Sequence, residues 1–422
     1  MRHWVRILAF FLCAWGSAAV KAAPLALYGF IDARAGVRVG DDVGDKDTSL
    51  GEVRLQLETE QYFDQVTFNA VVDFVLDPVA DEYRPDLASG EGAIDPRQLN
   101  VEFSPLDFAD LKLGRQVVTW GTGDLVFIND LFAKDWNSFF LGRDVEYLKA
   151  PVDALKASVF SSAANLDVVY TPKFGADRFV DGRRISFFDP QTGDFRGRDD
   201  PLSFDRPNDW FKDDEVAMRA YRSFGAIEAA LYAYHGFWKS PAGFDAGAAR
   251  ATFPKLNVYG ASLRGPVMGG VGWLEGGYYD SARGAAGDPL LPNSEFRLLA
   301  GFEKEIATEL TATIQYNLER KLDYDAYLQS LPPNIIRDNR DRHITTLRLT
   351  KLMLRQNLEL SLFNYYSPSD KDGYVRFNAS YKFTDNLKVE GGGNFFYGED
   401  DHTFFAQFRN NNNLYVGVRR SF

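Results

Sequence analysis

The chain has 422 residues and a formal net charge of −12, from 47 basic and 59 acidic side chains. This acidic balance argues against nucleic acid and other polyanions as partners. A single cysteine excludes a disulfide framework.

Residues 1–22 carry the pattern of a secretory signal peptide. Two arginines precede an apolar run from Ile7 to Ala14, and small residues lead to a cleavage site after Ala22. The run is too short to cross a bilayer comfortably, so a membrane anchor is the less favoured alternative. We expect an exported protein whose mature part, residues 23–422, has lost Cys13 and contains no thiol.

The mature chain is expected to form a single domain. No proline-rich or Gly-Ser tract divides it, and aromatic residues are frequent at 15%. No stretch after the signal reaches the apolar length of a transmembrane helix. The two open classes are a periplasmic β protein and an outer-membrane barrel.

Alternating polarity decides between these two classes. In "SLGEVRLQLETE" the apolar Val53, Leu55 and Leu57 lie on one face of a strand, opposite Glu52 and Arg54. The same period recurs in "DQVTFNAVVDF", "ELTATIQYNLE" and "YVRFNASYKF". These runs approach the roughly ten residues of a tilted membrane strand, whereas strands of soluble sheets have about 5–6 residues. The pattern predicts a transmembrane barrel with apolar faces toward lipid.

The connections between these runs alternate in length. Short turns are expected near residues 62–64, 104–109, 162–164, 223–225, 265–269, 304–308, 352–356 and 383–386. Longer polar segments are expected at about 40–48, 77–95, 120–152, 174–212, 236–253, 281–293, 320–341, 367–373 and 398–411. Short periplasmic turns and long extracellular loops characterise bacterial outer-membrane barrels. The sequence thus predicts an all-β, antiparallel transmembrane barrel of about 18 strands, within a range of 16–20.

The third long segment, residues 120–152, is rich in aromatic and acidic residues. Its aromatic residues include Trp120, Phe127, Phe132, Trp136, Phe139 and Phe140, and its aspartates are Asp124, Asp130, Asp135 and Asp144. Contiguous exposed apolar surface is costly, so we expect the loop to fold inward and constrict the barrel, with its acids and Arg143 facing the pore. A cap on neighbouring loops is the alternative. Arg115 and Gln116 lie where they could anchor the loop.

Charged residues on the polar faces of the strands are expected to line the lumen. They are Glu52, Arg54, Glu58, Arg297, Glu303, Glu319, Arg348, Arg376, Lys382, Lys388 and Glu390, with Arg115 at the end of its strand. Mixed rings of charge set the field that selects permeating solutes. The alternative for any one residue is pairing across strands. The overall surplus of acids favours a preference for cations.

The fourth long segment holds a cluster of acids that could bind calcium. They are Asp199, Asp200, Asp205, Asp209, Asp213 and Asp214. Their spacing does not follow the EF-hand pattern. A solvated surface, or one that meets lipopolysaccharide through bridging cations, is the favoured alternative, and no other metal or cofactor is expected.

The C-terminal "NNNNLYVGVRRSF" places Leu414, Val416 and Val418 on one face of a last strand. A barrel has no free edge, so this strand is expected to pair with a first strand at about residues 25–39. The segment "YVGVRRSF" resembles the C-terminal signal that the barrel-assembly machinery of Gram-negative bacteria reads. Tyr415, Gly417 and Phe422 match this signal, while Arg420 stands where an aromatic residue is usual.

The mature chain resembles porin-like outer-membrane proteins in its whole architecture. The segment "LKLGRQVVTWGTGDLVFINDLF" is similar to porin-like families of unassigned substrate and, more loosely, to the eighteen-stranded alginate exporter. The resemblance implies a location in the outer membrane of a Gram-negative bacterium, in contact with lipid, lipopolysaccharide and the assembly machinery. It favours a monomer over a trimer.

An aqueous channel for passive or substrate-selective diffusion of small hydrophilic solutes is the function we expect. Eighteen strands enclose a lumen too wide for side chains to fill, and a first strand near Leu25 leaves no room for the plug of a TonB-driven receptor. A scaffold that sheathes an electron-transfer partner, or a TonB-independent uptake or export channel, remains the alternative. Catalysis is not expected, because His235, His343 and His402 lie in no recognisable catalytic motif.

Overall fold

The computed structural model describes residues 26–40, 46–80, 84–87, 89–281, 286–332 and 336–422. The expected signal peptide, residues 1–22, lies outside the described residues. None of the helices within these ranges has the length and apolar character that a membrane crossing requires.

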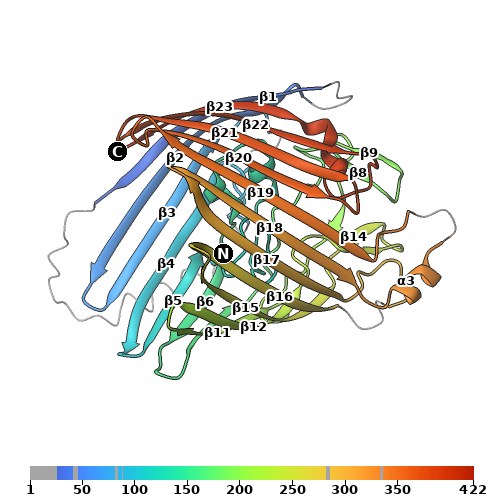
Figure 1. The fold of residues 1–422 in the computed structure, drawn as a ribbon, viewed down its shortest axis with the longest axis horizontal. Helices are drawn as coiled ribbons and strands as arrows, with labels where there is room; N and C mark the ends of the chain where they lie inside the picture. The colour runs from blue at the N-terminus through green and yellow to red at the C-terminus, as the bar shows by residue number, and fades with distance from the viewer. Residues whose placement is uncertain (1–25, 41–45, 81–83, 88, 282–285, 333–335) are drawn as a thin grey trace.

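Eighteen strands in the described part of the chain form one closed antiparallel sheet (Figure 1). They are β1 (Tyr28–Arg38), β2 (Thr48–Phe63), β3 (Val66–Leu76), β4 (Ile94–Leu106), β5 (Ala109–Gln116), β6 (Val152–Val159), β7 (Asn165–Thr171), β11 (Glu215–Phe224), β12 (Ile227–Phe237), β15 (Lys255–Val267), β16 (Gly270–Ser281), β17 (Glu295–Ala307), β18 (Leu310–Lys321), β19 (Asp341–Met353), β20 (Leu358–Ser367), β21 (Asp372–Thr384), β22 (Leu387–Gly398) and β23 (Asn413–Ser421). Successive strands are neighbours, which confirms the expected fold class and strand number.

The barrel closes where β23 pairs with β1, as expected from the C-terminal sequence. The seam continues past the strands, because Phe422 N donates to Gly29 O at 3.0 Å and Gly29 N donates to Phe422 O at 3.2 Å. The final residue is therefore part of the ladder. Tyr415 is buried and faces inward, and a Cβ at Gly417 would lie 3.2 Å from Cγ of Arg34. Recognition of these residues by an assembly machinery stays a prediction.

Along each strand, side chains alternate between a polar face that points into the barrel and an apolar face that points outward. In β18 Ile314 is 58% exposed, while the next residue, Gln315, is 2% exposed. In β2 Val53 is exposed, whereas Glu52 and Arg54 are buried. This polarity is the reverse of that of a soluble sheet, whose apolar face packs on a core. The outer surface is the apolar one, as in transmembrane β-barrels.

Short turns and long loops lie at opposite ends of the barrel (Figure 1). The turn between β2 and β3 has a left-handed residue, Asp64 with φ 52°, as tight hairpins require. The long connections contain β8 (Phe187–Asp189), β9 (Asp194–Arg196), β10 (Phe204–Asp205), β13 (Gly243–Asp245), β14 (Arg250–Thr252), α3 (Tyr324–Ser330) and η2 (Ala406–Asn411). One expected long loop, at 367–373, is itself a short turn between β20 and β21.

The apolar core lies inside the barrel, where residues 117–151 pack against the wall. In one cluster Ile128 of this segment is buried together with Tyr279 and Leu299 of the wall. In a second cluster Phe140 is buried with Tyr374, and the two ring centroids lie 5.6 Å apart. The segment between β5 and β6 therefore lies within the cylinder.

The exposed position Ile314 provides a test of the outward face. We expect Ile314→Lys to lower the free energy of unfolding by about 2–4 kcal/mol in lipid vesicles, because a charge would enter hydrocarbon. Ile314→Ala, which removes apolar area without adding charge, serves as the control and should cost less. Denaturant titration followed by tryptophan fluorescence measures both. Equal losses for the two variants would contradict a lipid-facing position.

Candidate permeation pathway

Residues 117–151 cross the interior in two arms. The first arm, residues 118–134, is irregular, and the second arm, residues 135–150, contains α2 (Trp136–Leu141) and η1 (Val145–Leu148). Asp135 caps α2 by accepting a hydrogen bond from Ser138 N at 2.7 Å. Gly142 ends the helix with a φ of 86°, and a Cβ there would come within 2.2 Å of the Tyr415 ring. These caps fix a short helix against β23.

The first arm is bound by polar side chains of β16 and β18. Glu275 accepts hydrogen bonds from Thr122 N at 2.7 Å and from Asn129 N at 2.8 Å. Gln315 bonds to both the N–H and the carbonyl of Asp124, each at 2.8 Å. The Asp124 carboxylate also pairs with Arg348 at 2.8 Å. Burial raises the pKa of Asp124, and Arg348 offsets part of this rise.

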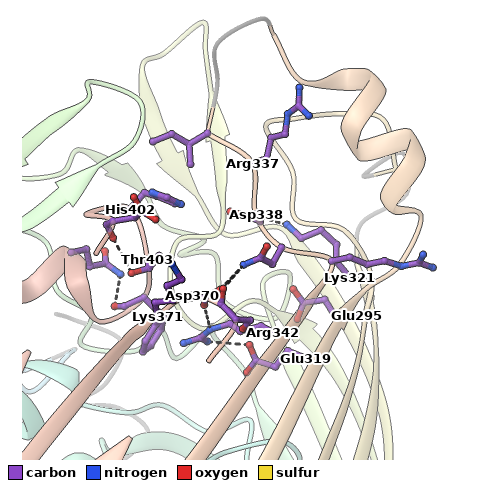
Figure 2. Close-up of a pocket in the computed structure, with 17 residues that line it drawn as sticks. Glu295, Glu319, Lys321, Arg337, Asp338, Arg342, Asp370, Lys371, His402 and Thr403 are labelled. Atoms are coloured by element: carbon purple, nitrogen blue, oxygen red, sulfur yellow. Dashed lines mark hydrogen bonds and ion pairs between the residues drawn. The ribbon is translucent and has the colours of Figure 1, made fainter. Parts of the chain in front are cut away.

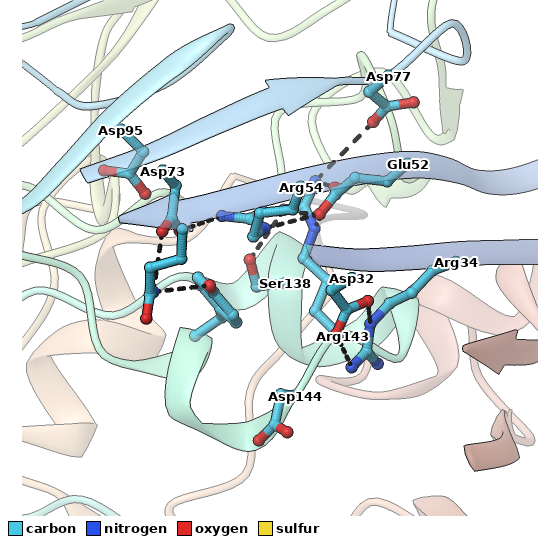
Figure 3. Close-up of polar contacts among 12 residues, drawn as sticks. Asp32, Arg34, Glu52, Arg54, Asp73, Asp77, Asp95, Ser138, Arg143 and Asp144 are labelled. Atoms are coloured by element: carbon cyan, nitrogen blue, oxygen red, sulfur yellow. Dashed lines mark hydrogen bonds and ion pairs between the residues drawn. The ribbon is translucent and has the colours of Figure 1, made fainter. Parts of the chain in front are cut away.

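The second arm is bound to β2 through Arg143 (Figure 3). Its Nε donates to Glu52 at 2.8 Å, and Nη1 donates to Ser138 Oγ at 2.9 Å. Glu52 also accepts from Arg54, which in turn pairs with Asp73 at 2.6 Å. Arg143 is thus bonded to the wall, where it pairs with the buried carboxylate of Glu52, and it also lines an interior cavity.

Asp144 joins the second arm to the last two strands. Its carboxylate lies 3.1 Å from Lys388 of β22 and 3.6 Å from Arg419 of β23. Burial alone would raise its pKa, but Lys388 and Arg419 outweigh this effect and lower the pKa to about 2. Arg34 of β1 donates to Gly142 O at 2.8 Å, so three strands hold this part of the loop.

The other two aspartates of the loop are also paired. Asp130 binds Lys134 at 2.9 Å and accepts from Thr119 Oγ1 at 2.7 Å. Asp135 lies 3.3 Å from Arg178 in the segment after β7. Both residues are buried, and Asp130 lines the cavity between the two arms while Asp135 lines a cavity nearer the long loops.

The two tryptophans of the loop pack against other loop residues and rings. Trp120 packs edge-on against Phe132 with a ring separation of 4.8 Å. Trp136 Nε1 donates to Asp177 at 3.1 Å.

Most of the expected lumen charges face the interior, and several bind the loop or its neighbours. Arg376 donates to Arg143 O at 2.9 Å, and Glu390 pairs with Arg34. Away from the loop, Arg297 pairs with Glu295, Glu319 with Arg342, and Glu303 with Thr313. Glu58 and Lys382 are exposed.

Arg115 is placed differently from the expectation. It lies opposite Leu99 in the ladder of β5 with β4, and Leu99 is 50% exposed on the outer face. Arg115 Nε bonds to Asp153 at 2.8 Å, and Nη1 donates to Leu87 O at 2.7 Å. Arg115 shares its face with Leu113 because the alternation continues to the strand end. It therefore does not line the lumen.

Three water-accessible chambers follow one another along the interior. The long-loop chamber, of about 600 Å3, is lined by residues of β2, β4, the second arm, the described segments 79–80, 84–86 and 90–92, and the segment 178–201. The middle chamber, of about 410 Å3, lies between the two arms and includes Asp124 and Phe127 in its lining. The short-turn chamber, of about 400 Å3, shares Thr119, Trp120 and Arg219 with the middle chamber. The long-loop and middle chambers have no lining residue in common.

A further cavity of about 750 Å3 lies at the rim, between the loops that precede β19, β21 and β23. Figure 2 shows Arg342 between Glu319 and Asp370, and Lys321 directed at Asp338. Because its charges are largely paired with one another, this rim pocket has little net field with which to attract one sign of solute.

The aspartates of the fourth long segment are dispersed. Asp213 accepts hydrogen bonds from Asn208 N and Asp209 N, each at 2.9 Å, while Asp214 accepts from Tyr170 at 3.0 Å. Among the described residues, no group of three or more histidine, cysteine, aspartate or glutamate side chains could hold a metal ion.

Sequence reasoning missed several residues that shape the pathway. Glu275 was detectable in principle, because it alternates with the exposed Leu274 in "VGWLEGGYYD". Arg178 and Arg184 lie in irregular loop structure, where no period reveals which way a side chain points. Both bind aspartates far away in sequence, Asp95 and Asp77.

Solved structures are similar to this chain. OccAB1 of Acinetobacter baumannii aligns with 96% of this chain and 99% of its own, at 10% identity and a TM-score of 0.56. A triple mutant of the Rhodopseudomonas blastica porin aligns with 94% of this chain and 100% of its own, at 13% identity and a TM-score of 0.41. No family model and no curated protein matches the sequence. The similarity to OccAB1 shows that the two chains share a β-barrel fold.

Asp144 provides a pH test of how the second arm is held. A folded pKa of about 2, below the ordinary 3.8, contributes stability that is present above pH 3.8 and is lost as the pH falls toward 2. We expect Asp144→Asn to lower the free energy of unfolding by about 1–2 kcal/mol at neutral pH. The difference in free energy of unfolding between Asp144→Asn and the parent protein should become smaller as the pH falls from 3.8 toward 2. Denaturant titration in micelles measures this difference. Asp385→Asn, in an exposed turn, is the control. If the stability difference between Asp144→Asn and the parent protein did not change with pH, the role given to Asp144 would be contradicted.

Proposed function

We propose that the protein is a channel of the Gram-negative outer membrane through which small hydrophilic solutes diffuse. The main observation that supports this proposal is the series of charged, water-accessible chambers inside a barrel whose outer face is apolar. Loop 117–151 narrows the passage between them. Lipid and lipopolysaccharide would contact the outer face, and a single barrel is sufficient for the pathway.

The position of the loop supports a channel over a sheath for a protein partner. The second arm is bonded to the adjoining strands β1, β2, β21 and β23, and the first arm is bonded to β16 and β18. A partner inserted in the bore would have to break these hydrogen bonds and the ion pair of Arg143 with Glu52, which is costly.

The surroundings of the histidines do not favour catalysis. His235 bonds to Asn257 and His343 to Tyr316, each at 2.7 Å. Neither contact provides an activated nucleophile.

The long-loop chamber supports a preference for anions, opposite to the expectation from overall charge. Its basic lining residues are Arg38, Lys46, Arg54, Arg84, Arg143, Arg178, Arg183, Arg184 and Arg198, against the acidic Asp86, Glu91, Asp95, Asp135 and Asp181. Burial and the neighbouring Arg143 lower the pKa of Arg184, although Asp77 offsets part of this effect. The local field thus has an excess of positive charge, and local charge selects the permeating ion.

Conductance in planar bilayers tests the channel itself. We expect the purified protein to give discrete current steps and a form lacking residues 122–142 to give larger ones, because the deletion removes most of the narrowing loop. Heat-modifiable electrophoretic mobility verifies that both forms are folded. If neither folded form conducted current, the channel function would be refuted and the scaffold function would be favoured.

Reversal potentials in a potassium chloride gradient test the selectivity. We expect chloride to permeate better than potassium, and Arg184→Gln to reduce this ratio by about twofold, because one lining charge is lost. Arg320→Gln is the matched control, since Arg320 pairs with Asp341 opposite the exposed Phe296 and lines none of the three chambers. A cation preference in the parent protein would contradict the proposal.

A further inference from the structure

A single buried carboxylate ties the neck of a small loop in the first arm. Glu275, which is 2% exposed, accepts from the backbone N and Oγ1 of Thr122 at 2.7 and 2.8 Å. It also accepts from the backbone N and Nδ2 of Asn129 at 2.8 and 3.0 Å. Residues 122–129, called the pinned loop below, are therefore closed at their base by one side chain.

The backbone of the pinned loop is strained. Leu125 has a φ of 56°, a left-handed conformation that is unfavourable for a residue with a Cβ. At Gly123 a Cβ would come within 2.2 Å of Val126 O, so the tight turn requires glycine. Bonds from the wall hold this conformation, through Gln315 to Asp124 and through the Tyr365 hydroxyl to Leu125 O. Release of the loop would relieve the strain at Leu125.

Phe127, carried by the pinned loop, lies in the layer between two chambers. Its side chain lines the middle chamber. Its ring lies 4.7 Å from Lys134 Nζ and 6.2 Å from the Trp136 ring. Asp135 and Asn137, the chain neighbours of those two residues, line the long-loop chamber. Moving Phe127 would thin this partition.

The second arm is held in a different way. Its bonds come from many side chains, among them Arg34, Arg97, Arg376 and Arg419, and its rings belong to a buried aromatic cluster. No single change frees it. The two ends of the pinned loop, in contrast, share one partner, because Glu275 bonds to both Thr122 and Asn129, while Asn129 also donates to Gly276 O and Tyr279 donates to Ile128 O. Of the two arms, the first contains the segment that can move as a unit.

We propose that the pinned loop is the gate of the channel, with Glu275 as its latch and Phe127 as the side chain that closes the passage. This proposal rests on the channel function proposed above. In the closed state the neck is bonded to Glu275 and the long-loop and middle chambers are separate. In the open state the neck is released, the backbone at Leu125 relaxes and Phe127 leaves the partition.

Single-channel recording of Glu275→Gln and Phe127→Ala tests the latch and the gate. Losing one hydrogen bond to a charged group should raise the ratio of open to closed time by about tenfold in Glu275→Gln. Phe127→Ala should raise the current of the closed level. Glu305→Gln is the matched control, because Glu305 bonds to Glu309 N in a short turn and touches neither arm. Traces of the first two variants that match the parent and Glu305→Gln would overturn the gate.

A reversible cross-link tests the same idea without removing the latch. A Cβ at Gly277 would lie 2.8 Å from Cγ2 of Ile128, within reach of a disulfide, and the chain has one native cysteine, Cys13. We expect Ile128→Cys/Gly277→Cys to stay closed when oxidised and to open normally after reduction. If the oxidised and reduced forms opened equally often, the gate proposal would be overturned. Currents through the form that lacks residues 122–142 would still support the channel function. If no form conducted current, including the form that lacks residues 122–142, the channel function itself would be refuted.

Discussion

The need to pair every backbone N–H and C=O in hydrocarbon is the constraint on which this structure depends. It forces the sheet to close, and the closure reaches the last residue, since Phe422 bonds to Gly29 across the seam. Closure in turn divides every strand into a lipid face and an inner face. The charges that a soluble sheet would place outside are thereby enclosed, and they must find partners or water inside the cylinder.

Those enclosed charges find many of their partners in the internal loop. Glu52 binds Arg143, Lys388 binds Asp144, and Glu275 binds the neck of the first arm. The wall therefore positions the loop, and the loop neutralises the wall. The lining of the long-loop chamber contains more basic than acidic residues, and Arg184 within it pairs with Asp77. An acidic chain can in this way contain a basic vestibule.

The two arms of the loop differ in how their stability is distributed. Dispersed ion pairs and a ring cluster make the second arm a rigid part of the barrel. The first arm stores backbone strain at Leu125, and the two ends of its neck, Thr122 and Asn129, both bond to Glu275. Segments that move are drawn from the less stable parts of a fold, so rigidity and mobility are assigned to neighbouring parts of one loop.

The sequence by itself determined the barrel, its strand number, the closure by the last strand and the facing of residues such as Glu52 and Ile314. Strand pairing and alternation are local properties, so a two-residue period is sufficient to predict them. Tertiary structure alone decided which charges meet. Asp124, Asp130 and Asp135 line the interior chambers, but the sequence did not show that they pair with Arg348, Lys134 and Arg178. Irregular loops have no period, and their contacts join residues far apart along the chain, so only the closed cylinder brings these partners together.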